Sequence, residues 1–116
     1  MGALHEPVLL AECMELLAVR PGGFWVDGTV GAGGHAAEML RRSAPDGRLL
    51  GCDRDADALR VAAETLAPFG PRARLVQADY RELPGLLDDT PDGMLLDLGV
   101  SSMQLDRPER GFGLKT

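Results

Sequence analysis

Two carboxylates and the glycines between them are the residues of this sequence best suited to bind a small molecule. Asp27 ends the apolar run at 24–26, the glycine-rich stretch GTVGAGGH follows at 28–35, and Asp53 ends a second apolar run at 48–52. Glycine lets a backbone approach a ligand closely, and a helix start offers N–H groups to it. A carboxylate after the second strand can accept hydrogen bonds from ribose hydroxyls. The pattern predicts a nucleoside-cofactor crevice at the carboxyl ends of parallel strands.

Alternating strand and helix patterns position these residues. Apolar runs predict strands at 24–27, 48–53, 73–77 and 94–98, and helical spacing predicts helices at 7–19, 35–42 and 56–66 and a short one at 83–87. Asp55 is expected to cap the third helix, whose apolar face would include Leu59, Ala62, Ala63 and Leu66. The alternation predicts an α/β fold with a mainly parallel sheet. The fourth strand is as apolar as a central one, so we expect a larger sheet that is truncated after it.

Composition limits the classes of function. The 116 residues suffice for one domain at most, and a net charge of −6 gives no overall basic footprint for nucleic acid, so an RNA partner would need a local basic surface. Cys13 and Cys52 lack the spacing of a metal site, which predicts reduced thiols in a cytoplasmic protein and no metal. The sequence shows neither a membrane-spanning run nor a signal-peptide pattern.

The choice of cofactor depends on the acids at the strand ends. The stretch GAGGHA at 31–36 satisfies G-x-G-x-x-A, with Asp53 at the usual distance for a dinucleotide site, so a nicotinamide-dependent dehydrogenase is a legitimate alternative. However, Asp27 would repel a pyrophosphate, whereas it could accept a hydrogen bond from the ammonium group of a methionine moiety. S-adenosylmethionine has no phosphate and carries a cationic sulfonium. Acids at four strand ends therefore favour a methyltransferase: Asp27, Asp53, Asp79 and Asp97.

Longer segments of the sequence closely resemble the MraW/RsmH family. The matching segments lie at 5–10, 26–35, 53–55 and 96–106, and 110–112 continues the match. Members are bacterial S-adenosylmethionine-dependent methyltransferases that modify N4 of a cytidine in the decoding region of small-subunit (16S) rRNA. The resemblance implies a Rossmann-like methyltransferase fold. It also implies that residues 1–116 are the N-terminal part of the cofactor-binding domain, without the inserted domain and later strands of the longer family members.

The resemblance also assigns roles to individual residues. It puts the methionine end of the cofactor against Gly33, Gly34 and His35, the ribose on Asp53, and the adenine beside Tyr80; Asp97 and Gln104 align with further cofactor contacts. Asp97 is also the candidate catalytic residue, since many DNA amino-methyltransferases place an acid or amide followed by Pro-Pro-aromatic after the fourth strand. This chain keeps the acid and lacks the rest of that pattern. Ala36 stands where many family members carry Ser.

The implied partner is small-subunit rRNA or the ribosomal subunit, with no membrane. The isolated chain is expected to bind cofactor weakly, to self-associate through the edge of its fourth strand, and to leave rRNA unmethylated. A non-catalytic nucleoside-binding fragment is therefore the third alternative, beside the methyltransferase and the dehydrogenase.

Overall fold

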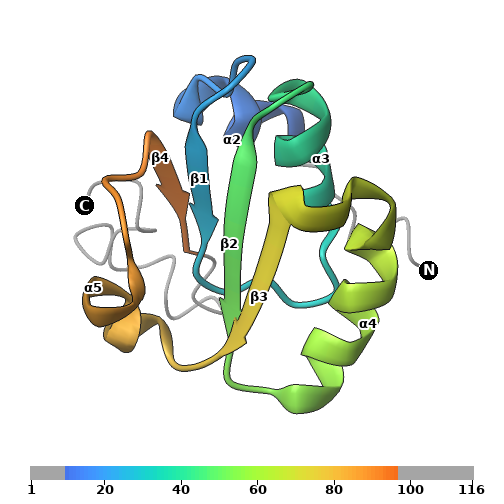
Figure 1. Ribbon diagram of the computed structural model, residues 1–116, viewed down its shortest axis with the longest axis vertical. Helices are drawn as coiled ribbons and strands as arrows, with labels where there is room; N and C mark the ends of the chain where they lie inside the picture. The colour runs from blue at the N-terminus through green and yellow to red at the C-terminus, as the bar shows by residue number, and fades with distance from the viewer. Residues whose placement is uncertain (1–9, 97–116) are drawn as a thin grey trace.

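In the computed structural model, which describes residues 10–96, four parallel strands form a sheet with helices packed against it (Figure 1). The strands are β1 (Phe24–Asp27), β2 (Arg48–Asp53), β3 (Ala73–Gln77) and β4 (Gly93–Leu95). Their order is β3-β2-β1-β4, and every neighbouring pair is parallel. The predicted α/β fold is therefore confirmed. The chain builds outward from β1 to β3 and then crosses to the other side of β1, so a topological switch point lies beside β1, where α/β sheets bind ligands.

The strand bounds agree closely with those predicted from the sequence. β1, β2 and β3 have the predicted ends, whereas β4 begins one residue early and ends at Leu95. The remainder of the predicted fourth strand includes Leu96, which is outside β4, and residues 97–98, which lie outside the described residues. In the register, Asp27 lies opposite Gly51, so β2 extends two residues beyond β1 at the carboxyl edge. This extension gives the chain after β1 a surface on which to fold.

The described helices precede the first strand or connect one strand to the next. They are α2 (Leu10–Leu17), α3 (Gly34–Arg42), α4 (Ala56–Leu66) and α5 (Leu83–Leu86), with 3-10 turns η1 (Ala67–Arg72) and η2 (Tyr80–Glu82). α4 begins as predicted, since the Asp55 side chain accepts a hydrogen bond of 2.9 Å from the Asp57 N–H. The part of the predicted 7–19 helix before Leu10 lies outside the described residues.

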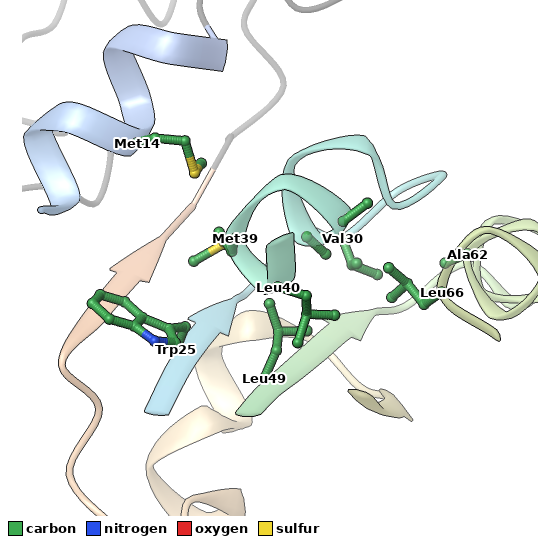
Figure 2. Packing of buried hydrophobic residues seen from close by; sticks show 10 residues of the cluster. Met14, Trp25, Val30, Met39, Leu40, Leu49, Ala62 and Leu66 are labelled. Carbon is green, nitrogen blue, oxygen red and sulfur yellow. The ribbon is translucent and has the colours of Figure 1, made fainter. Parts of the chain in front are cut away.

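α2, α3 and α4 contribute to the apolar core on one face of the sheet (Figure 2). Its buried side chains are Met14, Trp25, Val30, Ala36, Ala37, Met39, Leu40, Leu49, Ala62 and Leu66. The prediction that Ala63 belongs to this face was wrong, because Ala63 is exposed. Successive helical residues differ by about 100° in direction, so Ala63 turns outward while Ala62 points inward.

The opposite face of the sheet has its own core beside α5. Its buried residues are Phe24, Val26, Leu50, Cys52, Ala78 and Leu83, and Tyr80 is among the half-buried side chains packed against them. Residues of β1 and β2 thus alternate between two buried faces, as expected of a parallel sheet. Within residues 10–96, no helix has the length and apolar character needed to cross a membrane.

Candidate functional site

The first part of the candidate site is the end of β1, where Asp27 is buried. The residue is 2% exposed, and its Oδ1 accepts a hydrogen bond of 3.2 Å from the Thr29 N–H. The next residue, Gly28, donates its N–H to the Leu95 carbonyl at 2.8 Å. A Cβ at Gly28 would collide with the Leu96 side chain. The glycine therefore allows the chain leaving β4 to pass close to the end of β1.

The glycine-rich loop then folds back onto the extended end of β2. The N–H of Val30 donates to the Cys52 carbonyl at 2.9 Å, and the buried Val30 side chain joins the first core. Gly31 has a φ of +53°, which favours glycine. Its N–H donates to Asp53 Oδ2 at 2.9 Å. Two successive N–H groups of the loop are thus held by residues at the carboxyl end of β2.

The surroundings of Gly33 and Gly34 differ. Gly33 caps α3 with a φ of +97°, and a Cβ there would lie 3.3 Å from Thr65 Cβ and 3.4 Å from the Cα of Ala62. It thus allows α3 and α4 to pack closely. At Gly34, by contrast, a Cβ would meet nothing within 4 Å. Open space therefore adjoins the start of α3, and the half-exposed His35 lies in the first turn.

Asp53 lies at the end of β2 with both carboxylate oxygens engaged by backbone N–H groups. Oδ2 accepts from Gly31, and Oδ1 accepts from the Asp55 N–H at 2.9 Å. The side chain remains partly exposed. A carboxylate has about four lone-pair positions, so each oxygen keeps capacity for a further donor, such as a ribose hydroxyl.

Beyond β3, Asp79 belongs to a charged cluster that the sequence patterns did not reveal. Arg81 donates to it from its backbone N–H at 2.9 Å and from its guanidinium at 3.0 Å, and Arg54 lies 3.7 Å away. The hydrogen bonds from Arg81 lower the pKa of Asp79 to about 2. Asp79 is therefore ionised at neutral pH. The arginines were visible in the sequence, but only the turn at η2 brings Arg81 back onto this carboxylate.

Cys52 underlies the same edge of the sheet as a buried thiol. Its Sγ–H donates to the Ala78 carbonyl at 3.0 Å. Burial raises its pKa to about 11, and the nearby carboxylate of Asp53 adds to the shift. Cys52 is therefore a protonated thiol at neutral pH. Neither it nor the half-buried Cys13 forms a disulfide within the described residues.

The predicted site residues that the structure describes gather at the carboxyl ends of neighbouring strands. The glycine loop with Gly33, Gly34 and His35 follows β1, Asp53 ends β2, and Tyr80 follows β3. A Cβ on Gly28 would lie 3.3 Å from Tyr80 Cβ, so Tyr80 comes close to the end of β1. Asp97 and Gln104 lie outside the described residues. Sequence reasoning missed the Gly31–Asp53 hydrogen bond and the close approach at Gly28.

These residues fit a nucleoside cofactor with a methionine moiety. Open space adjoins Gly34, and Asp53 keeps acceptor capacity for hydroxyl groups. The buried Asp27 beside the loop suits an ammonium group better than a phosphate. Among residues 10–96, His, Cys, Asp and Glu form no group of three that could hold a metal ion.

Comparisons with known proteins identify relatives of this chain. A curated relative, the ribosomal RNA small subunit methyltransferase H of Symbiobacterium thermophilum, is 57% identical over 97% of the chain, which spans 36% of that protein. The relative from Syntrophus aciditrophicus with the same name is 59% identical over 95% of the chain, again spanning 36% of its length. The chain therefore covers about a third of the curated relatives that it matches.

Solved structures and the family pattern complete the comparison. TrmN from Thermus thermophilus superposes with a TM-score of 0.73 at 27% identity, covering 84% of this chain and 30% of TrmN. A SAM-dependent O-methyltransferase from Thermotoga maritima shares the fold, with a TM-score of 0.67 at 21% identity over 79% of this chain and 35% of its own. The fold is thus the Rossmann-like fold of S-adenosylmethionine-dependent methyltransferases. The sequence pattern described as the MraW methylase family matches residues 2–116, and the chain belongs to that family.

Proposed function

We propose that this chain is the N-terminal part of the cofactor-binding domain of an S-adenosylmethionine-dependent rRNA methyltransferase. Its target would be N4 of a cytidine in the decoding region of small-subunit (16S) rRNA. The match of the MraW methylase pattern to residues 2–116 carries this proposal. It is supported by relatives named ribosomal RNA small subunit methyltransferase H. The ribosome as substrate implies action in the cytoplasm.

The arrangement of acids supports S-adenosylmethionine over a dinucleotide. Asp27 is buried beside the glycine loop, where a pyrophosphate would meet its negative charge in a poorly solvated position. The family resemblance supplies the residue roles. Gly33, Gly34 and His35 would hold the methionine end, and Asp53 would accept hydrogen bonds from the ribose. The remaining cofactor contacts would be Tyr80, Asp97 and Gln104.

The protein would contribute mainly orientation and electrostatics to the reaction. When bound, S-adenosylmethionine supplies an electrophilic methyl group on a sulfonium. Transfer needs the acceptor nitrogen in line with the methyl carbon and sulfur, so positioning provides much of the acceleration. The N4 lone pair of cytosine is delocalised into the ring. We assign to Asp97 the role of accepting a hydrogen bond from the amino group, which would favour the pyramidal, nucleophilic geometry.

Much of the rRNA-binding surface would belong to the inserted domain and later strands of the family. The net charge of −6 leaves this chain without an overall electrostatic attraction for RNA. Enzymes that modify a base edge act on unstacked nucleotides. A single-stranded or splayed cytidine would therefore be the substrate.

Methyl transfer to ribosomal subunits tests the proposal. The protein would be a chimera that joins residues 1–116 to the part of the Symbiobacterium thermophilum relative that the chain does not cover. Labelled S-adenosylmethionine and small subunits lacking the modification are the substrates, and the complete relative is the positive control. We expect label at N4 of a single cytidine with the chimera and none with the 116-residue chain alone.

Three outcomes would redirect the proposal. A folded chimera that transfers no methyl group, while the complete relative does, would leave the chain as a non-catalytic nucleoside-binding fragment. Hydride transfer to or from a nicotinamide cofactor would instead support the dehydrogenase alternative suggested by the glycine spacing. Methylation by the 116-residue chain at the rate of the chimera would show that the missing parts are dispensable.

A further inference from the structure

The glycine loop is held by contacts to the end of β2. Val30 donates its N–H to the Cys52 carbonyl at 2.9 Å, and its side chain is buried against the sheet. Gly51 makes room for it, since a Cβ there would lie 3.0 Å from Val30 Cγ2. The loop is therefore anchored just before it reaches the residues assigned to the methionine end.

At Gly31 the backbone takes a positive φ of +53° and its N–H is held by a side chain, Asp53, at 2.9 Å. The next residue, Ala32, is exposed, and Gly33 is fixed again by capping α3. Gly31 thus lies between two anchored points, and its contact with Asp53 is a charge-assisted hydrogen bond. Such bonds are stronger than those between neutral groups.

We propose that Asp53 is a positioning residue for the glycine loop, in addition to the ribose acceptor that the proposed function makes it. Its Oδ2 holds the Gly31 N–H and keeps the loop in its binding conformation before the cofactor arrives. The other oxygen is fixed by the Asp55 N–H, so the carboxylate is itself oriented. Two of about four lone-pair positions remain for ribose hydroxyls, and the two roles are compatible.

This arrangement couples the two halves of the cofactor site. When only a fraction of the protein molecules has the conformation that binds a ligand, the apparent affinity for that ligand is reduced by the same fraction. Removing the Asp53 carboxylate would therefore weaken binding at the methionine end as well as at the ribose. We expect about a fivefold loss from the released loop alone, comparable to the loss of one hydrogen bond of moderate strength.

A ligand without ribose hydroxyls separates the two roles. The chimera that carries residues 1–116 and its Asp53→Ala variant would be titrated by calorimetry with S-adenosylhomocysteine and with its 2′,3′-dideoxy analogue. If Asp53 acts only on the hydroxyls, the substitution leaves the affinity for the dideoxy ligand unchanged, and the proposal is overturned. We expect that affinity to fall about fivefold, and the affinity for S-adenosylhomocysteine to fall further.

Amide exchange in the ligand-free chain provides an independent readout. In Asp53→Ala, the Gly31 amide should exchange faster relative to a core amide such as that of Leu50. Asp55→Ala is the matched control, since it removes the cap of α4 and leaves the Gly31 contact in place. Unchanged Gly31 exchange in a folded Asp53→Ala variant would contradict the proposal. The amide-exchange comparison does not require a ligand, so it tests the positioning role of Asp53 independently. If no ligand bound in the titration, that result would count against the proposed function instead.

A second variant covers the possibility that Asp53→Ala does not fold. Asp53→Asn keeps the shape of the side chain but has one oxygen in place of two. It cannot accept from both Gly31 and Asp55 through separate oxygens, so at least one of these amides should lose protection. Full protection of both amides would contradict the proposed role of the carboxylate.

Discussion

Replacing Gly28 by alanine tests how closely the chain after β4 packs on the end of β1. Gly28 is buried and does not have a positive φ, so its backbone can accept alanine and the cost is steric. The new Cβ would collide with Leu96 Cδ2 and would lie 3.1 Å from Leu83 Cδ1. Leu83 is buried in the second core, whereas the colliding methyl of Leu96 is the end of a flexible side chain.

The expected loss of stability follows from these contacts. Adding a methylene-sized group to a packed core typically costs about 1–3 kcal/mol. Because Leu96 is half-buried and can rotate away, we expect Gly28→Ala to lower the free energy of unfolding by about 1–2 kcal/mol. For a domain of this size, this corresponds to a decrease in Tm on the order of 5–10 °C.

Urea unfolding followed by circular dichroism measures this change. Gly85→Ala is the matched control, because Gly85 is in α5 without a positive φ and a Cβ there meets nothing within 4 Å. That variant should be neutral or more stable by roughly 0.5–1 kcal/mol, since alanine restricts the unfolded chain. If the free energy of unfolding of Gly28→Ala equals that of Gly85→Ala, then Leu96 and Leu83 do not pack closely against the end of β1.

Three further predictions concern charge, thiol reactivity and association. Because Arg81 holds the pKa of Asp79 at about 2, the stabilisation from this carboxylate is present above its ordinary pKa near 4 and lost as the pH falls toward 2. The difference in urea stability between the chain and Asp79→Asn should therefore shrink over that range, and a difference independent of pH would contradict the ion pair. Cys52, with its pKa raised to about 11, should be alkylated by iodoacetamide at pH 8 only as fast as the chain unfolds. Peptide mass spectrometry measures the rate of this alkylation. A rate in the folded chain equal to that in the denatured chain would contradict the expectation. The 116-residue chain should self-associate through the β4 edge in sedimentation, and a monomer at all concentrations would remove that expectation.

The sequence predicted the strands well because their signals are local. The apolar runs of β1, β2 and β3 are bounded by glycine, proline and acidic residues, and the cap of α4 depends only on Asp55 and its neighbours. Ala63 was misassigned because a small apolar residue at the margin of a helix face has no strong preference for burial. The strand order, with its switch point beside β1, also depends on long-range pairing that no local pattern encodes.

The site was predictable as a set of residues but not as a set of contacts. The strand-end acids and the glycine spacing indicated the crevice, and the family resemblance added the roles. The bond between Gly31 and Asp53 joins residues 22 positions apart and requires the loop to fold onto the extended end of β2. The identity of Gly28 likewise depends on Leu96, a residue far along the chain that reaches β1 only through the crossover to β4.

Calorimetric titration of the cofactor tests the central claim most directly. The chimera that carries residues 1–116 would be titrated with S-adenosylmethionine, S-adenosylhomocysteine and NAD under the same conditions. We expect both adenosyl ligands to bind at a single site and NAD to bind more weakly or not at all, because Asp27 is buried beside the glycine loop. Tighter binding of NAD than of either adenosyl ligand would contradict the assignment of this crevice to S-adenosylmethionine.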